Sequence, residues 1–283
     1  MVLVNGCFAC WELGDDFLCC GFLEYHCAAL LGNPGVLAMI EHHAVLYADL
    51  VDPLAMLAAP RGSTGLAQYW PYAAVEAPGA VASDSTRAYT RLMSASQQLV
   101  AGEILDAYAV RGHRCVLDVG GGDGTFLRAL AARAPEAQLM LFDLPGVAAQ
   151  AESAFAAAGL AAKARVVPGD FSRDALPTGA DLITFVRVLH DHDDPRVERM
   201  LRAAYEALPP GGRLLVAEPL AGTAGAGRMG DAYFGVYLWA MGSGRPRTAA
   251  ELTDMLRAAG FRRIRRRPTR IPLQTSVLVA ERG

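Results

Sequence analysis

The sequence lacks the features that mark a membrane, secreted or nucleic-acid-binding protein. No run approaches the roughly 18 consecutive apolar residues that a membrane-spanning helix needs. The first residues do not follow the basic-then-apolar order of a signal peptide, so we expect a cytoplasmic protein. The formal net charge is only −3 over 283 residues, which argues against a general nucleic-acid-binding function.

Lysine and cysteine are also scarce. Lys163 is the only lysine among 26 basic residues, a bias that we attribute to base composition rather than function. Only Cys115 lies outside the first 27 residues. The remaining cysteines and a histidine could be drawn as a zinc site, but their CxxC spacing is not repeated, so we expect unpaired thiols and no metal; they are Cys7, Cys10, Cys19, Cys20, His26 and Cys27.

Apolar residues are plentiful, at 53% against 19% charged, which is ample for a buried core. The chain divides into two predicted parts. Residues 1–110 form a helical N-terminal region, in which apolar residues recur at helical spacing over 35–57 and again over 83–108. Pro60, Arg61 and Gly62 end the first of these stretches.

Residues 111–283 follow a different pattern, in which short apolar runs alternate with helical segments. Strands are predicted at 115–119, 139–142, 165–167, 182–186, 214–217, 263–268 and 276–281. Helices are predicted at 126–134, 147–158, 195–207 and, after a Thr248-x-x-Glu251 capping box, up to residue 259. The alternation predicts an α/β fold: a Rossmann-like, seven-stranded, mostly parallel sheet with helices on both faces.

A glycine-rich loop follows the first predicted strand, in the sequence Val-Gly-Gly-Gly-Asp-Gly. Gly120 and Gly122 let the backbone turn tightly and let a ligand approach the main chain, but such a loop also suits dinucleotides. Acids end three successive strands, and a carboxylate so placed accepts hydrogen bonds from ribose hydroxyls. These acids favour a ribose and a cationic ligand over a pyrophosphate; they are Asp118, Asp143 and Asp170, the last followed by Phe171, which can lie on an adenine.

Four motifs in order between residues 115 and 261 resemble the class I S-adenosylmethionine-dependent O-methyltransferases of the plant phenol and bacterial polyketide type. They are Asp-Val-Gly-Gly-Gly-Asp-Gly, Phe-Asp-Leu-Pro, Gly-Asp-Phe and Val-Leu-His-Asp-His-Asp-Asp. The resemblance implies that S-adenosylmethionine is the cofactor and that the glycine loop and the three acids bind it. Segments at 30–34, 69–72, 190–194 and 230–248 further resemble the carotenoid enzymes of the hydroxyneurosporene and demethylspheroidene type, which implies a hydroxylated carotenoid as the methyl acceptor.

His190 follows the fourth predicted strand, at the edge where such sheets bind ligands. Methyl transfer to a hydroxyl requires removal of its proton, and imidazole is the natural acceptor near neutral pH. The resemblance places the family's general base on His190 and its orienting acid on Glu218, at the end of the fifth strand. Two positions depart from the family: His192 replaces the usual tryptophan, and Ala249 replaces a helper glutamate.

The acceptor pocket is predicted from the aromatic helix before the capping box. The resemblance implies that this helix lines the pocket, with help from Met93 on an earlier helix; plain core packing is the alternative for each residue. The predicted lining is Met93, Tyr233, Phe234, Tyr237 and Met241. The arginine-rich stretch at 262–270 is interpreted as a solvated strand face, with weak attraction to an anionic membrane as the alternative.

The family carries a winged-helix dimerisation domain, and residues 1–110 are interpreted as a truncated or divergent copy of it. A homodimer would then depend on residues 35–57 alone or be lost. Three other functions stay open at this point: methylation of a phenolic polyketide or a bacteriochlorophyll precursor, a catalytically impaired S-adenosylmethionine-binding remnant, and a nicotinamide oxidoreductase.

Overall fold

The computed structural model describes residues 34–69 and 83–283. The predicted cysteine-rich leader, with its zinc alternative, and most of the segments at 30–34 and 69–72 lie outside the described residues. Among the described residues, no helix is long and apolar enough to cross a membrane.

The described part of the N-terminal region, residues 34–69 and 83–110, is mainly helical, as predicted. Its helices are α2 (Pro34–Asp49), α3 (Pro53–Ala58), α4 (Gly65–Tyr69) and α5 (Ser83–Ala107). The expectation of one helical stretch over 35–57 was wrong in one respect, because the helix stops at Asp49 and restarts at Pro53. Asp52 caps the new helix by accepting a hydrogen bond from the Ala55 amide at 2.9 Å, and Pro53 occupies the first turn, where its missing N–H costs nothing.

The remainder of the chain forms one seven-stranded sheet in the order β3-β2-β1-β4-β5-β7-β6. All neighbours are parallel except β7, which runs antiparallel to both β5 and β6. This confirms the predicted fold, and every predicted strand is present. The strands are β1 (Cys115–Val119), β2 (Gln138–Asp143), β3 (Ala164–Pro168), β4 (Leu182–Val186), β5 (Arg213–Glu218), β6 (Phe261–Arg267) and β7 (Ser276–Arg282).

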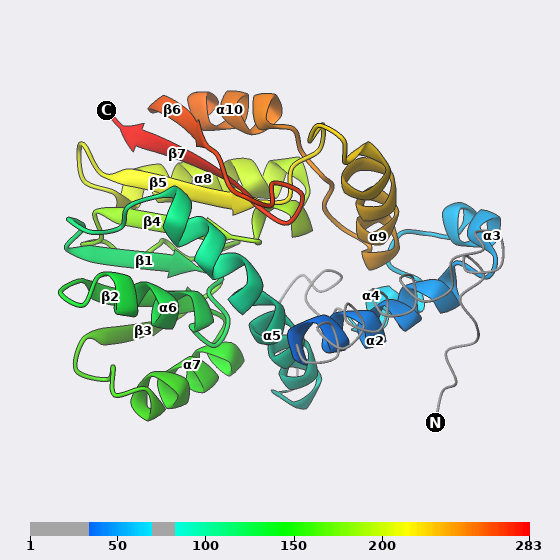
Figure 1. The fold of residues 1–283 in the computed structure, drawn as a ribbon, viewed down its shortest axis with the longest axis horizontal. Helices are drawn as coiled ribbons and strands as arrows, with labels where there is room; N and C mark the ends of the chain where they lie inside the picture. Colours follow the sequence, from blue (N-terminus) through cyan, green and yellow to red (C-terminus); the bar gives the residue numbers. More distant parts are fainter. Residues whose placement is uncertain (1–33, 70–82) are drawn as a thin grey trace, which may run out of the picture.

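Helices cover both faces of this sheet (Figure 1). The ones that follow the strands are α6 (Thr125–Arg133), α7 (Pro145–Ala157), α8 (Asp194–Ala207), α9 (Phe234–Met241) and α10 (Ala249–Ala258), with a short 3-10 helix η2 (Leu189–Asp191) and a π-helical turn η3 (Gly227–Tyr233). The predicted capping box at Thr248 and Glu251 is formed.

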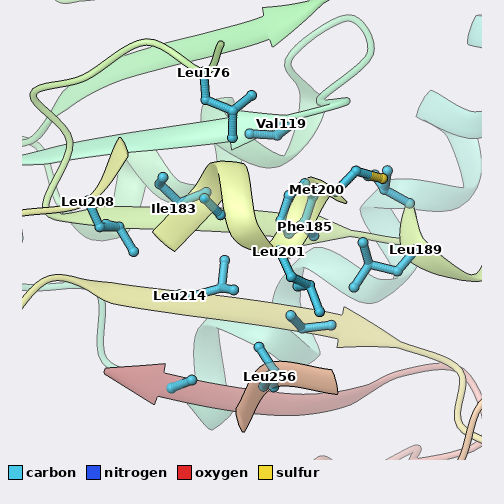
Figure 2. Packing of buried hydrophobic residues seen from close by; sticks show 14 of the residues in the cluster. Val119, Leu176, Ile183, Phe185, Leu189, Met200, Leu201, Leu208, Leu214 and Leu256 are labelled. Carbon is cyan, nitrogen blue, oxygen red and sulfur yellow. The ribbon is translucent and has the colours of Figure 1, made fainter. Parts of the chain in front are cut away.

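The core is split by the sheet into two apolar layers, one under α8 and α10 and the other under α5 and α6. Figure 2 shows part of the first layer, where Met200 and Leu201 of α8 lie beside Phe185 of β4 and Leu214 of β5. Burial of each leucine side chain stabilises the folded state by about 1.5–3 kcal/mol relative to leaving that side chain exposed. A third cluster joins α2, α3 and α4 to α9, so the N-terminal helices pack against the segment that was predicted to line the acceptor pocket.

Candidate active site

The glycine loop at the carboxyl end of β1 passes directly over Asp118. Gly122 has a φ of +61°, a left-handed conformation that favours glycine. A Cβ on Gly121 would lie 2.6 Å from Oδ2 of Asp118, so only glycine fits there. The backbone amide of Gly122 donates to Oδ2 of Asp143 at 2.8 Å, which ties the ends of β1 and β2 together. The loop therefore holds two carboxylates side by side beneath an open turn.

These two carboxylates are buried, with Asp118 1% and Asp143 9% exposed. Burial raises the pKa of Asp118 to about 7 and that of Asp143 to about 6; the neighbouring Asp143 adds to the first shift, while hydrogen bonds from Thr184 to Asp118 and from two backbone amides to Asp143 oppose them. Among the described residues, Oδ2 of Asp118 has no hydrogen-bond partner. An orphaned buried carboxylate oxygen fits a ligand that brings positive charge or hydrogen-bond donors.

A cavity of about 150 Å³ opens beside this pair. Its lining includes all six residues predicted to bind the cofactor, contributed by the ends of β1, β2 and β3; they are Asp118, Gly120, Gly122, Asp143, Asp170 and Phe171. The structure thus brings together every predicted cofactor residue, at the strand-order switch point where open α/β sheets bind ligands. The donor set therefore fits the S-adenosyl group that the resemblance implies.

His192 closes one side of the cavity. Its ring meets that of Phe171 edge to face, with 5.2 Å between the ring centroids. Burial lowers the pKa of His192 to about 4, so the imidazole is neutral at physiological pH. Its Nδ1 is buried and has no hydrogen-bond partner in the part of the chain that the structure describes. Replacing the family's tryptophan with histidine thus puts a polar atom into the cavity wall.

His190 lies in η2, next to this cavity, and both of its ring nitrogens face carboxylates. Nδ1 hydrogen-bonds to Oε2 of Glu218, and Nε2 lies 3.0 Å from Oδ1 of Asp191. The other oxygen of Glu218 accepts the backbone amides of Val188 and Leu189 at 3.0 and 2.7 Å. Burial opposes a charge on His190, but Asp191 and Glu218 outweigh it and raise the pKa to about 10. In this arrangement the side chain is an imidazolium ion held between two acids.

The segment that carries His190 is held in place by the glycine- and arginine-rich stretch that follows α9 in the sequence. The Arg247 side chain, only 2% exposed, donates to the carbonyl oxygen of Leu189 at 2.8 Å and to that of His192 at 2.6 Å. A Cβ on Gly244 would lie 2.0 Å from the His190 carbonyl oxygen, so this close approach requires glycine. Sequence reasoning gave no role to Arg247, Gly244 or Asp191, and the only available signal was the density of glycine and arginine in this stretch.

The predicted acceptor residues split into two groups. Phe234 meets the His190 ring edge to face at 5.2 Å, and Tyr237 stacks on Phe234 at 6.0 Å. Met93, however, lies in the lining of the cofactor cavity. Tyr233 stacks on a ring of α2, and Met241 is fully buried in the cluster between α9 and the N-terminal helices. Of the predicted acceptor residues, only Phe234 and Tyr237 therefore form a continuous line of ring contacts that starts at His190.

One N-terminal residue, missed by sequence reasoning, completes this series. Nε2 of His42, in α2, lies 2.8 Å from the Tyr237 hydroxyl. Burial and the neighbouring His43 lower the pKa of His42 to about 4, so this ring is neutral. Helix α2 therefore supplies part of the surroundings of α9.

Comparison with known proteins identifies the family to which the chain belongs. Residues 71–262 match the family model of the O-methyltransferase domain. The demethylspheroidene O-methyltransferase of Rhodobacter capsulatus is 44% identical, over 90% of this chain and 63% of that protein, and its counterpart from Cereibacter sphaeroides is 46% identical, over 90% and 67%. The chain thus spans about two thirds of the length of these curated relatives.

Solved structures agree with this placement. Human N-acetylserotonin methyltransferase in complex with SAM superposes with a TM-score of 0.73 over 87% of this chain and 70% of that one, and its 23% identity supports the fold alone. The O-methyltransferase NcsB1, solved with S-adenosyl-L-homocysteine and 1,4-dihydroxy-2-naphthoic acid, is 31% identical with a TM-score of 0.63, over 71% of this chain and 58% of that one. The chain belongs to the O-methyltransferase domain family.

Proposed function

We propose that this chain is an S-adenosylmethionine-dependent O-methyltransferase acting on a hydroxyl of an apolar small molecule. The observation that carries the proposal is the placement of a buried histidine, His190, beside a cavity whose walls hold the orphaned carboxylate of Asp118. The first supplies a proton acceptor, and the second selects a positively charged donor. Family membership and the two relatives named for demethylspheroidene support the same reaction.

The donor would be held by residues from three strands. Asp143 would accept hydrogen bonds from the ribose hydroxyls, while Asp170 and Phe171 would take the adenine. Asp118 would face the charged amino-acid end. When bound, S-adenosylmethionine supplies an electrophilic methyl group on a positively charged sulfur. The charge complementarity explains why two carboxylates with raised pKa values are buried here without a cation of their own.

His190 would act as the general base, with Glu218 as the residue that orients it. To take a proton from the acceptor hydroxyl, Nε2 must be unprotonated and released from Asp191. Glu218 keeps hold of Nδ1 throughout, which fixes the ring and stabilises the imidazolium that forms. In the arrangement of the structure the two acids raise the pKa of His190 to about 10, so loss of the Asp191 contact lowers that pKa and frees the base.

A hydroxylated carotenoid of the hydroxyneurosporene or demethylspheroidene type is the proposed acceptor. The wall beyond His190 is aromatic, with Phe234 and Tyr237 stacked in series, and an elongated polyene matches such a wall. A phenolic polyketide or a bacteriochlorophyll precursor is the second candidate, since other relatives carry names of aromatic substrates, such as a 3-hydroxy-5-methyl-1-naphthoate 3-O-methyltransferase of Streptomyces sahachiroi at 34% identity.

The test is a methyl-transfer assay with labelled S-adenosylmethionine and each acceptor class in detergent. We expect a methyl ether of the carotenoid alcohol as the product. Transfer to the phenolic acceptor alone would move the proposal to the second candidate. Binding of S-adenosylhomocysteine without transfer to any acceptor would identify a cofactor-binding remnant instead, and binding of NAD would indicate an oxidoreductase.

We further propose that residues 1–110 act as a separate helical region that completes the acceptor side and mediates a homodimer, while residues 111–283 form the methyltransferase domain. The α2–α3 corner is apolar and exposed, with Tyr47 at 58%, Val51 at 85% and Leu54 at 78%. Such a surface favours self-association over solvent, and weak membrane contact is the alternative. Sedimentation equilibrium of the wild type and of Val51→Asp separates dimer from monomer.

A further inference from the structure

A strongly basic hollow lies along β6 and β7 and shares no lining residue with the cavity beside His190. It has a volume of about 250 Å³, with Val279, Ala280 and Tyr108 among its lining residues. Four guanidinium groups surround it, and we call it the arginine groove; they are Arg213, Arg263, Arg265 and Arg267. Strand β6 is the edge strand of the sheet, beyond β7 (Figure 1).

The strand register shows how far the groove extends toward the candidate active site. Arg213 is the first residue of β5, whose other end carries Glu218. Strand β6 runs antiparallel to β7, which runs antiparallel to β5, so Arg263 lies near the same amino-terminal end as Arg213. Arg265 is level with Leu215 and Arg267 with Ala217, however, so the groove extends along β6 and β7. Its lining shares no residue with the cavity beside His190, and the groove is independent of the proposed methyl transfer.

The charges of the groove are poorly balanced. Glu281 is the single acid in its lining, and it pairs with Arg263 at 2.9 Å. Arg213 donates to the Tyr108 hydroxyl at 3.1 Å, which is a neutral partner. Across the described part of the chain, Arg265 and Arg267 have no ion-pair partner, and Nε of Arg267 is buried without a hydrogen bond. A buried guanidinium nitrogen without an acceptor is costly and points to a missing anion.

Acids close to the groove are already engaged elsewhere. Glu103 and Asp106 on α5 both pair with Arg270 at 2.9 Å. Asp181 accepts the backbone amides of Arg114 and Cys115 and lies 3.6 Å from the His113 ring. None of these carboxylates is free to neutralise the arginine groove.

The backbone of β6 is distorted at the groove. Arg262 pairs with Glu281 and Arg265 with Val279, so Arg263 and Ile264 both face Ala280 in a β-bulge. Arg263 has a φ of +49°, a left-handed conformation that is strained for a residue other than glycine. Bulges re-aim side chains, and here the result is a third guanidinium from one strand in the same hollow.

We propose that the arginine groove binds a phosphate group carried by a small soluble molecule. Planar guanidinium forks match the oxygens of phosphate in paired hydrogen bonds, and four of them surround a space larger than phosphate alone. A lipid headgroup offers the same chemistry. The unpartnered Nε of Arg267 is, however, buried, so a small soluble phosphate reaches it more readily than a headgroup held in a bilayer, which favours a soluble ligand over a lipid surface.

The experiment titrates the full-length protein with inorganic phosphate by calorimetry at constant ionic strength, in parallel with co-sedimentation on phosphatidylglycerol vesicles. The test variants are Arg265→Gln and the double variant Arg265→Gln/Arg267→Gln. Arg199→Gln, an exposed arginine on α8 outside the groove, is the matched control for the loss of one charge. Thermal unfolding of each variant verifies that the fold is intact.

We expect saturable phosphate binding that weakens about tenfold in the double variant, less in the single variant, and not in Arg199→Gln. Phosphate binding that is absent in the wild type, or equal in the double variant, overturns the proposal. Vesicle binding without binding of free phosphate also overturns it, in favour of a lipid surface. A catalytically dead protein that still binds phosphate in this way supports the groove and leaves the proposed function as a separate question.

Discussion

Two pairs of carboxylates lie at the same edge of the sheet, and they differ in what balances their charge. Glu218 and Asp191 hold a resident cation, the imidazolium of His190, whose pKa is thereby raised to about 10. Asp118 and Asp143 have no paired cation among the described residues, and burial raises their own pKa values instead. One pair is complete in the protein alone, whereas we propose that a cationic ligand completes the other.

This difference assigns the two halves of the site different tasks. The pair formed by Glu218 and Asp191 is held rigidly. Two backbone amides donate to Glu218, and Arg247 donates a hydrogen bond to the Leu189 carbonyl oxygen in the same loop. This pair is suited to holding and moving one proton. The incomplete pair lies under the glycine loop, facing the cavity, and is suited to selecting charge. Mutations in the two pairs should therefore separate turnover from donor binding.

The largest expected effect is on turnover, from His190→Ala. Loss of a positioned general base should lower kcat by about 10²–10⁴-fold. Affinity for S-adenosylhomocysteine should stay within about twofold, because the ring does not line the donor cavity. Calorimetry and the methyl-transfer assay measure the two quantities. Near-normal turnover in this variant would remove His190 from the role of base.

The next effect is on donor binding, from Asp118→Asn. The substitution keeps the shape but removes the charge, so affinity for S-adenosylmethionine should fall about tenfold to a hundredfold. The ligand-free protein should be equally stable or more stable at pH 8, where the buried charge is unfavourable. Asn variants of Asp123, which also lines the cavity but pairs with Arg128, serve as the comparison. An unchanged donor affinity would break the distinction between the two pairs.

A third prediction concerns pH. Since the pKa of His190 is raised, the free base becomes more abundant as pH rises, and kcat/KM should increase from pH 7 toward pH 10. Asp191→Asn removes one of the two stabilising charges, so the rising limb should move to lower pH. The same linkage means that the contribution of His190 to stability is fully present below pH 6.5 and is lost as pH rises through about 10.

A pH profile that is the same in Asp191→Asn would contradict this reading of the complete pair. Glu218→Gln serves as a second variant, because it should also shift the limb downward while loosening the ring from Nδ1.

The smallest expected effect is on the affinity for the donor, from substitutions of His192. His192→Phe keeps a ring but removes the unpartnered Nδ1, whereas His192→Asn keeps a polar atom at the same distance from the backbone. If Nδ1 bonds the nucleoside half of the donor, the Phe variant should bind both S-adenosylhomocysteine and 5′-methylthioadenosine about five- to tenfold more weakly. The Asn variant should bind them nearly normally. Equal losses in both variants would mean that the ring, and not its nitrogen, matters.

The donor half of the site could be predicted almost completely from the sequence. Acids that end consecutive parallel strands must meet at one edge, so Asp118, Asp143 and Asp170 were placed by topology alone. Their meeting in one cavity with Gly120 and Phe171 follows from the same rule. Strand positions were predicted because buried runs and capping signals are local features.

The base half could be predicted only in part. Glu218 ends β5 and His190 lies just past β4, but their roles were predicted from the resemblance to the family and not from these positions alone. The support from Arg247 and the fit of Gly244 depend on a loop more than 50 residues away folding back, which no local pattern reveals; the contact of Asp191 with Nε2 joins adjacent residues and was missed. The break between α2 and α3 was missed, although Asp52 and Pro53 together form a readable start signal.

The central claim is that Asp118 and Asp143 form a charge-deficient pair that a cationic donor completes. Calorimetric titration with S-adenosylmethionine at pH 6.5, repeated in buffers of different ionisation enthalpy, measures the protons exchanged on binding. With pKa values of about 7 and about 6 in the free protein, the pair carries roughly one proton at that pH, so binding should release about one proton. Binding without proton release at pH 6.5, or with proton uptake, would contradict the account.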